Sequence, residues 1–265
     1  MFKHILIAHD LRSTADLALR RAAQLAQQHG VRLSVLHVLD PTQSEQTHDH
    51  ARQALDASIS QYAPPGSELQ LRSGKPSEVV LQHLRENGHD LLVLGGHLER
   101  HEFFSGTSLD RIARNCPVPL LLVAHPSPGP YQQALSAIDF SLCACSALAG
   151  AYGLLPESAE LHAVHVFDPG KASGEQVDSQ LQIQQALIAQ LLEDEARLLP
   201  PSGPTISHAV HQGGILRCLQ EQLRARNSDL LVLGSHGRGA LSQALLGSLA
   251  QHFLHKAPCD VFVVR

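Results

Sequence analysis

The sequence predicts two α/β domains in tandem, each built on a doubly wound parallel sheet. Three observations lead to this fold class. Short apolar strands alternate with helices along the chain, the second half repeats the order of the first, and one buried strand runs into a glycine-rich loop that opens a helix. Strands alternating with helices indicate a parallel sheet covered on both faces. Because ligands of such sheets bind beyond the carboxyl ends of the strands, a site is expected there.

The repeat consists of matched segments that keep their order. Asp90–Gly95 recurs as Asp229–Gly234, and Leu36–Pro41 recurs as Val164–Pro169. The segment 125–130, with the sequence HPSPGP, separates the copies. Its prolines and glycine cannot continue a helix or a central strand. We therefore predict domain 1 over residues 1–126 and domain 2 over residues 130–265.

The first copy begins with the apolar strand Ile5–Ala8, which is followed by an aspartate. The next segment, Ala15–His29, is rich in Ala, Leu and Arg and predicts a helix. Ser13 or Thr14 can cap its start. Gly30 is expected to end it, because glycine readily adopts the left-handed conformation at a helix C-terminus.

The remaining elements follow the same pattern in both copies. Asp90–Leu94 is apolar after its first residue, as expected for a parallel strand buried on both faces. The other elements expected in the first copy are Val31–Leu39 (strand), Asp49–Tyr62 (helix), Glu68–Arg72 (strand), Ser77–Asn87 (helix) and Leu120–Ala124 (strand). Those expected in the second copy include Ala134–Ile138 (strand), Asp178–Leu199 (helix), Thr205–Val210 (strand), Leu249–Lys256 (helix) and Val261–Val264 (strand).

The glycine-rich loop of the second copy, residues 234–248, is the most informative segment. Three glycines lie within its first six residues, and Gly247-Ser248 opens the helix that follows. Glycines bring backbone N–H groups close to a ligand, and a helix N-terminus adds unpaired N–H groups and partial positive charge. The loop therefore predicts an anion site suited to a polyphosphate, with Ser248 and Arg238 as further donors. The plainer interpretation is a turn in which Ser248 only caps the helix.

The loop also resembles a known motif. Gly234-x2-Gly237-x9-Gly247-Ser248 matches every fixed position of the G-x2-G-x9-G-[ST] motif found in ATP-binding members of the universal stress protein family. The resemblance covers both halves, so the chain looks like a tandem universal stress protein. It implies a Rossmann-like, adenine nucleotide alpha hydrolase-like fold. It also implies that the last strands of the two copies pair within one chain as an intrachain pseudo-dimer, which leaves further dimerisation open.

The resemblance further implies which residues contact an adenine nucleotide. Asp139 would meet the adenine, backbone at Val166 would frame the base, and the loop glycines would surround the phosphates. A carboxylate can accept a hydrogen bond from the adenine amino group but would repel a phosphate. An aspartate that only forms a turn is the plainer alternative for Asp139. The full nucleotide site predicted in this way is Ala137, Ile138, Asp139, Val166, Gly213, Leu233, Gly234, His236, Gly237, Arg238, Gly239, Gly247, Ser248 and Leu249.

The corresponding loop of the first copy departs from the motif. Leu98 replaces the middle glycine, and Glu99 and Glu102 add negative charge where a polyphosphate would lie. We therefore expect the first copy to bind ATP weakly or not at all. Gly74-Lys75-Pro76 keeps close to the family's turn at another point of the pocket. A weaker second site stays open, formed by Asp10, Val38, Gly74, Gly95, Gly106 and Thr107.

Composition argues against several other classes of protein. The formal net charge is -5 without a basic block, which argues against nucleic-acid and membrane-surface partners. No apolar run approaches the roughly 20 residues of a membrane span. The five cysteines lack a CxxC pair and are expected to be reduced, Cys143 and Cys145 included. The histidines form pairs without a third ligand, so no metal site is predicted.

These features together predict a cytoplasmic stress-response protein that binds ATP or a related adenine nucleotide, with or without magnesium, mainly in domain 2. Protein partners would read the surface that the nucleotide alters. No pair of carboxylates is placed for magnesium beside the loop, so at most weak ATP hydrolysis or autophosphorylation is expected, assisted by His236 and Arg238. Two alternatives stay open, an enzyme that consumes nucleotide and a nucleotide-independent interaction protein that holds another ligand.

Overall fold

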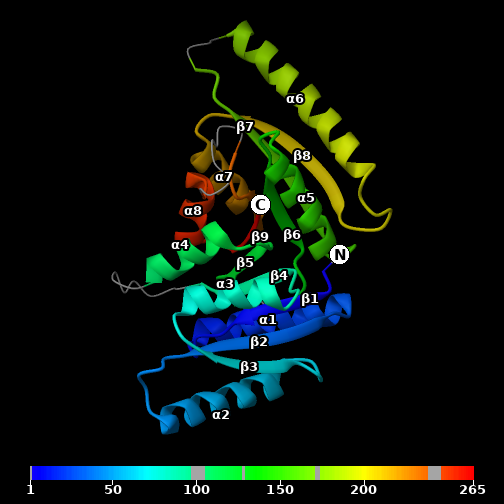
Figure 1. The fold of residues 1–265 in the computed structure, drawn as a ribbon. Coiled ribbons are helices and arrows are strands. Elements are labelled where there is room, and N and C mark those ends of the chain that lie inside the picture. The colour runs from blue at the N-terminus through cyan, green and yellow to red at the C-terminus, as the bar shows by residue number, and fades with distance from the viewer. Residues whose placement is uncertain (1, 97–104, 127–128, 171–173, 238–245) are drawn as a thin grey trace. The chain divides into compact units, whose positions relative to one another are not determined.

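The computed structural model describes residues 2–96, 105–126, 129–170, 174–237 and 246–265 (Figure 1). The chain divides into two compact units. The first contains the chain up to Pro130 together with Gln251–Val261. The second contains Tyr131–Gln243, Gly247–Ala250 and Phe262–Arg265.

The first unit is a parallel sheet with helices between its strands. The strand order is β3-β2-β1-β4-β5, and all four neighbouring pairs run parallel. The order therefore reverses between β1 and β4, which makes the carboxyl ends of these two strands a switch point. The elements are β1 (His4–Ala8), α1 (Ser13–His29), β2 (Arg32–Leu39), α2 (Glu45–Tyr62), β3 (Glu68–Ser73), α3 (Pro76–Glu86), β4 (Leu91–Gly95), α4 (Ser105–Asn115) and β5 (Leu120–Val123).

The second half of the chain repeats this order. Its strands follow the sequence β8-β7-β6-β9-β10, with parallel pairing of β8 with β7, β7 with β6 and β6 with β9. The switch point here lies between β6 and β9. The elements are β6 (Gln133–Ala137), α5 (Leu142–Leu154), β7 (Glu160–Phe167), α6 (Glu175–Ala196), β8 (Thr205–Gln212), α7 (Ile215–Ala225), β9 (Leu230–Gly234), α8 (Ser248–His255) and β10 (Asp260–Val264).

The predicted fold class is confirmed, and most element bounds move by a few residues. The helix α1 shows one error in the prediction. Its N-cap is Arg12, which makes no side-chain capping bond, so Ser13 and Thr14 lie inside the helix and do not cap it. Gly30 ends the helix as predicted, with a left-handed φ of 63°. The helix α2 begins before the predicted Asp49 because the Ser44 side chain accepts from the Thr47 backbone N–H.

Two glycines allow the helix that follows the first strand to lie close to the switch point. A Cβ on Gly95, at the end of β4, would lie 2.6 Å from the Thr14 carbonyl oxygen. A Cβ on Gly234, at the end of β9, would lie 2.9 Å from the Ala144 nitrogen. Since these neighbours are backbone atoms, they have little freedom to move away. Gly95 and Gly234 therefore set how closely α1 and α5 approach the sheet.

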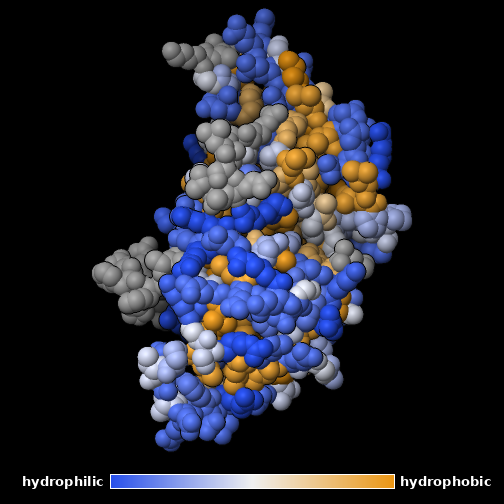
Figure 2. Space-filling view, in the orientation of Figure 1, coloured by the Kyte–Doolittle hydropathy of each residue, from blue (hydrophilic) through white to orange (hydrophobic). Residues whose placement is uncertain are grey.

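The helix α6 covers the second sheet only in part. Ile188 and Leu192 are its buried residues, whereas Ile183 is 57% exposed and Leu187 is 49% exposed. Figure 2 shows apolar atoms along the course of α6 at the surface. Among the described residues, no helix combines the length and the apolar character needed to cross a bilayer.

Candidate functional site

A cavity of about 250 Å³ opens at the switch point of the second unit. This volume lies just below the roughly 300–1,000 Å³ of small-molecule pockets, so a nucleotide would also need the mouth of the cavity. Its wall includes most residues that the sequence assigned to a nucleotide. They are Ala137, Ile138, Asp139, Val166, Leu233, Gly234, His236, Gly237, Gly247, Ser248 and Leu249.

Asp139 lies two residues after the end of β6. One of its carboxylate oxygens takes part in a turn, and the other lies toward the loop. Its Oδ1 accepts from the Ser141 backbone N–H at 3.1 Å and from the Ser141 hydroxyl. The plainer role, an aspartate that forms a turn, is therefore present in the structure. Its Oδ2 lies 2.5 Å from the position that a Cβ on Gly237 would occupy. A side chain at residue 237 would thus push against the carboxylate.

The junction of the loop with α8 brings backbone close to backbone. A Cβ on Gly247 would lie 3.1 Å from the Ser235 carbonyl oxygen, so a larger residue would crowd the loop. The Gly247 N–H itself donates to that carbonyl at 2.7 Å. This amide is therefore engaged, and a phosphate could recruit it only after breaking the bond. Ser248 follows as the first residue of α8 and is exposed.

Three of the predicted nucleotide residues are not placed on this wall. Gly213 is not among its lining residues. It has a φ of +135° and donates its N–H to the Phe167 carbonyl at 3.0 Å, which makes it a turn glycine after β8. Arg238 and Gly239 lie outside the described residues.

The sequence interpretation missed the apolar part of the wall. The missed lining residues are Ala144, Val164, Ile215, Leu219 and Ala250. Ile215 and Leu219 belong to α7 and stand four residues apart, so they share a helix face. That spacing was the available signal, but a core contact explains it equally well without the tertiary structure. These residues give the cavity an apolar side on which a flat ring could pack.

Comparison with known proteins assigns the chain to a family. The model described as the Universal stress protein family matches residues 1–124 and 130–265. The chain belongs to the universal stress protein family. A universal stress protein of Thermus aquaticus is 29% identical over 136 residues, which cover 46% of this chain and 99% of that protein. One of Synechocystis is 46% identical over 44 residues, or 17% of this chain and 41% of that protein.

Solved structures agree with the assignment at the level of the fold. A universal stress protein from Archaeoglobus fulgidus superposes with a TM-score of 0.73 at 19% identity, and covers 99% of this chain and 98% of its own. A protein of unknown function from Pseudomonas aeruginosa gives 0.68 at 17% identity, with coverage of 99% and 92%. Both alignments extend over almost the full chain, as expected for a tandem universal stress protein.

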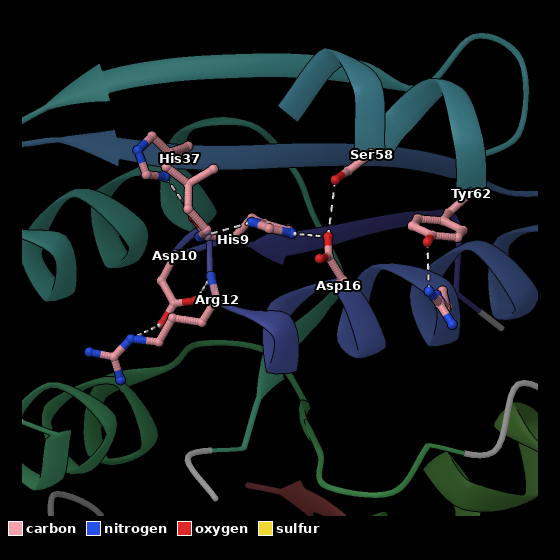
Figure 3. A network of polar contacts seen from close by, with 9 residues as sticks. His9, Asp10, Arg12, Asp16, His37, Ser58 and Tyr62 are labelled. Atoms are coloured by element: carbon pink, nitrogen blue, oxygen red, sulfur yellow. Dashed lines mark hydrogen bonds and ion pairs between the residues drawn. The ribbon is translucent and has the colours of Figure 1, made fainter. Parts of the chain in front are cut away.

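The first universal stress protein repeat has a different polar network at its switch point (Figure 3). His9 stands where the second repeat has Ile138, and it is only 4% exposed. Its Nδ1 accepts from the Leu11 backbone N–H at 3.1 Å, so its Nε2 carries the proton and faces Asp16 Oδ1 at 3.2 Å. Burial lowers the pKa of His9, against the opposing effect of the hydrogen bond to Asp16.

Asp10, the counterpart of Asp139, is engaged with its own turn. Its Oδ1 accepts from the Arg12 backbone N–H at 3.1 Å, and its Oδ2 lies 3.7 Å from Arg12 Nε (Figure 3). Val38 lies in β2 near its carboxyl end. Gly74 repeats the geometry of Gly213, with a φ of +138° and an N–H bonded to the Leu39 carbonyl.

The other residues predicted for the first site differ in how far the structure describes them. Gly95 ends β4 against α1. Gly106 and Thr107 lie in the first turn of α4. Leu98, Glu99 and Glu102 lie outside the described residues.

One histidine in each repeat links two neighbouring strands, and the two histidines occupy equivalent positions. His37 Nδ1 donates to the His9 carbonyl at 2.7 Å, and His165 Nδ1 donates to the Ile138 carbonyl at 2.7 Å. Each bond fixes the backbone just before the aspartate that follows, Asp10 in the first repeat and Asp139 in the second. These histidines therefore have a structural role. Within the described part of the chain, no group of three or more His, Cys, Asp or Glu side chains is arranged to hold a metal ion.

Proposed function

We propose that the second domain, residues 130–265, binds ATP or a related adenine nucleotide, and that the chain acts as a stress-response regulator in the cytoplasm. One observation carries the proposal. The cavity at the switch point between β6 and β9 is lined by Asp139, Gly237 and Ser248, which come from three separate segments and were assigned to one nucleotide by the family resemblance. Family membership supports the same assignment.

The chemistry of the cavity suits the two ends of such a ligand. Ile138, Val166 and Leu219 offer apolar surface for a purine ring, and Asp139 Oδ2 offers an acceptor for its amino group. At the opposite side, Gly237 and the start of α8 offer backbone N–H groups and the positive end of a helix for phosphates. Magnesium would be carried in by the phosphates, since Asp139 is the one carboxylate among the described lining residues.

The first domain, residues 1–126, is proposed to bind nucleotide weakly or not at all. Asp10 is bonded to Arg12, and beside it the buried His9, paired with the partly exposed Asp16, takes the place of an apolar residue. In the second domain the corresponding residue, Ile138, lines the cavity. We also propose that the closing strands of the two domains pair within the chain, so that one molecule takes the place of a dimer.

A matched pair of substitutions tests the site. Asp139→Asn keeps the size of the side chain and its turn but removes the charge and one acceptor, and Asp10→Asn makes the same change in the first repeat. Titration calorimetry with ATP and magnesium should show about tenfold weaker binding for Asp139→Asn, equivalent to ~1.4 kcal/mol. Asp10→Asn should bind as the unchanged protein does. Equal affinities in all three proteins, or no heat of ATP binding in the unchanged protein, would overturn the proposal.

A second substitution tests the loop. Gly237→Leu places the residue of the first loop into the second one, where its Cβ would meet Asp139 Oδ2. ATP binding should be lost, while thermal unfolding shifts by no more than a few degrees because Gly237 is exposed. Retention of ATP binding in a folded Gly237→Leu protein would place the phosphates elsewhere.

A further inference from the structure

A cysteine and a histidine meet beside the cavity of the second domain. Cys143 lies in the first turn of α5, half-buried, and its Sγ is 3.4 Å from His236 Nε2. The two residues come from different elements, since His236 lies two residues after the end of β9. His236 lines the cavity, whereas Cys143 lies behind it and packs on Gly234. A thiol this close to an imidazole has a neighbouring acceptor for its proton.

The hydrogen bond between His236 and Ser235 bears on which ring nitrogen of His236 carries the proton. Its Nδ1 lies 2.8 Å from the hydroxyl of Ser235, a residue that is only 2% exposed. If Nδ1 carries the proton and donates to Ser235, Nε2 is the unprotonated nitrogen, and it is the nearer of the two to Cys143 Sγ, at 3.4 Å against 4.0 Å for Nδ1. Ser235 thus holds the ring in place, and His236 Nε2 is positioned to accept the thiol proton. This arrangement of nucleophile, base and orienting group is typical of activated thiols.

Cys145 provides a contrast on the same helix. Burial, followed by the nearby Glu195 carboxylate, raises the pKa of the Cys145 thiol to about 11. The thiol is therefore held in its protonated, unreactive form at neutral pH. Two cysteines within one turn of helix thus differ in the group that faces them, an imidazole for Cys143 and a carboxylate for Cys145.

We propose that Cys143 and His236 form an oxidant-reactive pair, at which hydrogen peroxide converts the Cys143 thiol to a sulfenic acid. His236 Nε2 takes the thiol proton as the sulfur electron pair attacks one peroxide oxygen. The O–O bond breaks, and the departing hydroxide takes the proton from His236 and leaves as water. The sulfur is oxidised by two electrons and the peroxide is reduced by two. The start of α5 supports the negative charge that develops on sulfur.

Oxidation at Cys143 also affects the neighbouring cavity, a step that rests on the proposed nucleotide function. A Cβ on Gly234 would already lie 3.0 Å from Cys143 Cβ, so there is little space on that side of the thiol. An oxygen added to Sγ on the side of His236, whose Nε2 is 3.4 Å away, would push against that ring, which is part of the cavity wall. Bound nucleotide and oxidised Cys143 should then oppose each other, with nucleotide slowing the oxidation.

The test measures sulfenic acid at each thiol of the full chain. The reduced protein is treated with hydrogen peroxide in the presence of dimedone, which traps sulfenic acid, and the labelled residue is located by tandem mass spectrometry. Cys143 should be labelled about tenfold or more faster than Cys145, and His236→Gln should slow the labelling of Cys143 by a similar factor. Ser235→Ala, which frees the ring without removing it, should slow the reaction less. Cys145→Ser is the matched control and should leave the rate at Cys143 unchanged.

Equal labelling of Cys143 and Cys145, or an unchanged rate at Cys143 in a folded His236→Gln protein, would overturn the inference. If His236→Gln does not fold, an unchanged rate in Ser235→Ala has the same meaning. Saturating ATP should lower the rate at Cys143, and its failure to do so despite calorimetric binding would overturn the coupling to the cavity. If ATP does not bind while oxidation still depends on His236, the reactive pair stands and the nucleotide proposal fails.

Discussion

Acidification should destabilise the first domain through three histidines packed together at the amino-terminal edge of its sheet. His4, His83 and His89 are each less than 8% exposed, and the His89 ring centroid lies 4.0 Å from that of His4 and 5.1 Å from that of His83. Among the residues that the structure describes, neither ring nitrogen of His89 has a hydrogen-bond partner. Burial, and then the neighbouring His4, His83 and Arg32, lower the pKa of His89 to about 4.

The magnitude follows from the difference between the folded and unfolded states. The unfolded chain binds a proton at His89 below a pH of about 6.5, whereas the folded chain resists it down to about 4. Stability is therefore lost as the pH falls through this window, and from pH 7 to pH 5 the loss from His89 alone is about 2 kcal/mol. Burial also lowers the pKa of His4 and His83, with nearby Arg32 and Arg72 acting in the same direction, so the two residues add to the loss. Glu68, Asp90 and Glu86 act against it.

The assay compares the unchanged protein with His89→Leu. Leucine fills the site without an unsatisfied polar atom, so the variant should be more stable at pH 7 by about 1 kcal/mol. From pH 7 to pH 5 it should lose about 2 kcal/mol less than the unchanged protein. Hydrogen exchange of the β1 and β4 amides, corrected for intrinsic rates, reports the stability of this domain without requiring the whole chain to unfold in one step. Peptides from β6 and β9 should behave identically in both proteins. Parallel pH profiles for the two proteins at β1 and β4 would refute this reasoning.

Four further substitutions test individual contacts, and one of them, Gly153→Ala, serves as a control. Gly95→Ala should cost about 1–3 kcal/mol, because its Cβ would meet the Thr14 carbonyl, whereas Gly153→Ala, with nothing within 4 Å, should raise the melting temperature slightly. His9→Ile copies the second repeat but should cost about 0.5–1.5 kcal/mol in urea unfolding, because it removes one of two hydrogen-bond partners of Asp16 and leaves Ser58 as the other; a neutral result would mean that the His9–Asp16 pair contributes nothing. Ser141→Ala should cost about 0.5–2 kcal/mol, since Ser141 caps α5 at Ala144, and should weaken ATP binding by loosening Asp139; unchanged stability would argue against the cap.

The sequence predicted those features that depend on local pattern. Alternating strands and helices, the repeat and the glycine spacing at 234–248 were sufficient for the fold class and for most of the cavity wall. The error at the start of α1 arose because Ser13 and Thr14 are good capping residues, yet the chain leaves β1 through Leu11 with a φ of 64° and enters the helix at Arg12. The course of the chain after β1, and not the capping preference of Ser13 and Thr14, therefore decides which residue is the N-cap.

Contacts between distant segments could not be predicted in the same way. Cys143 and His236 are 93 residues apart, and neither sequence segment indicates that it contacts the other. The histidine cluster likewise joins the first strand, a helix and a connecting loop. Gly95 and Gly234 show a related limit, since the motif explained them by a ligand, whereas the structure gives them a packing reason as well.

The hydrogen bond from the Gly247 amide to the Ser235 carbonyl affects how quickly and how tightly the second domain can bind an anion. An anion that binds this amide must first displace the Ser235 carbonyl, and breaking that hydrogen bond reduces the net free energy of binding. The apparent affinity is the intrinsic affinity multiplied by the fraction of molecules in which the bond is already broken. Ser235 also holds the imidazole that faces Cys143. Breaking the bond to the Ser235 carbonyl would therefore also disturb the bond between its hydroxyl and His236. An anion bound at the loop and an oxidant acting at Cys143 would thus both act on Ser235.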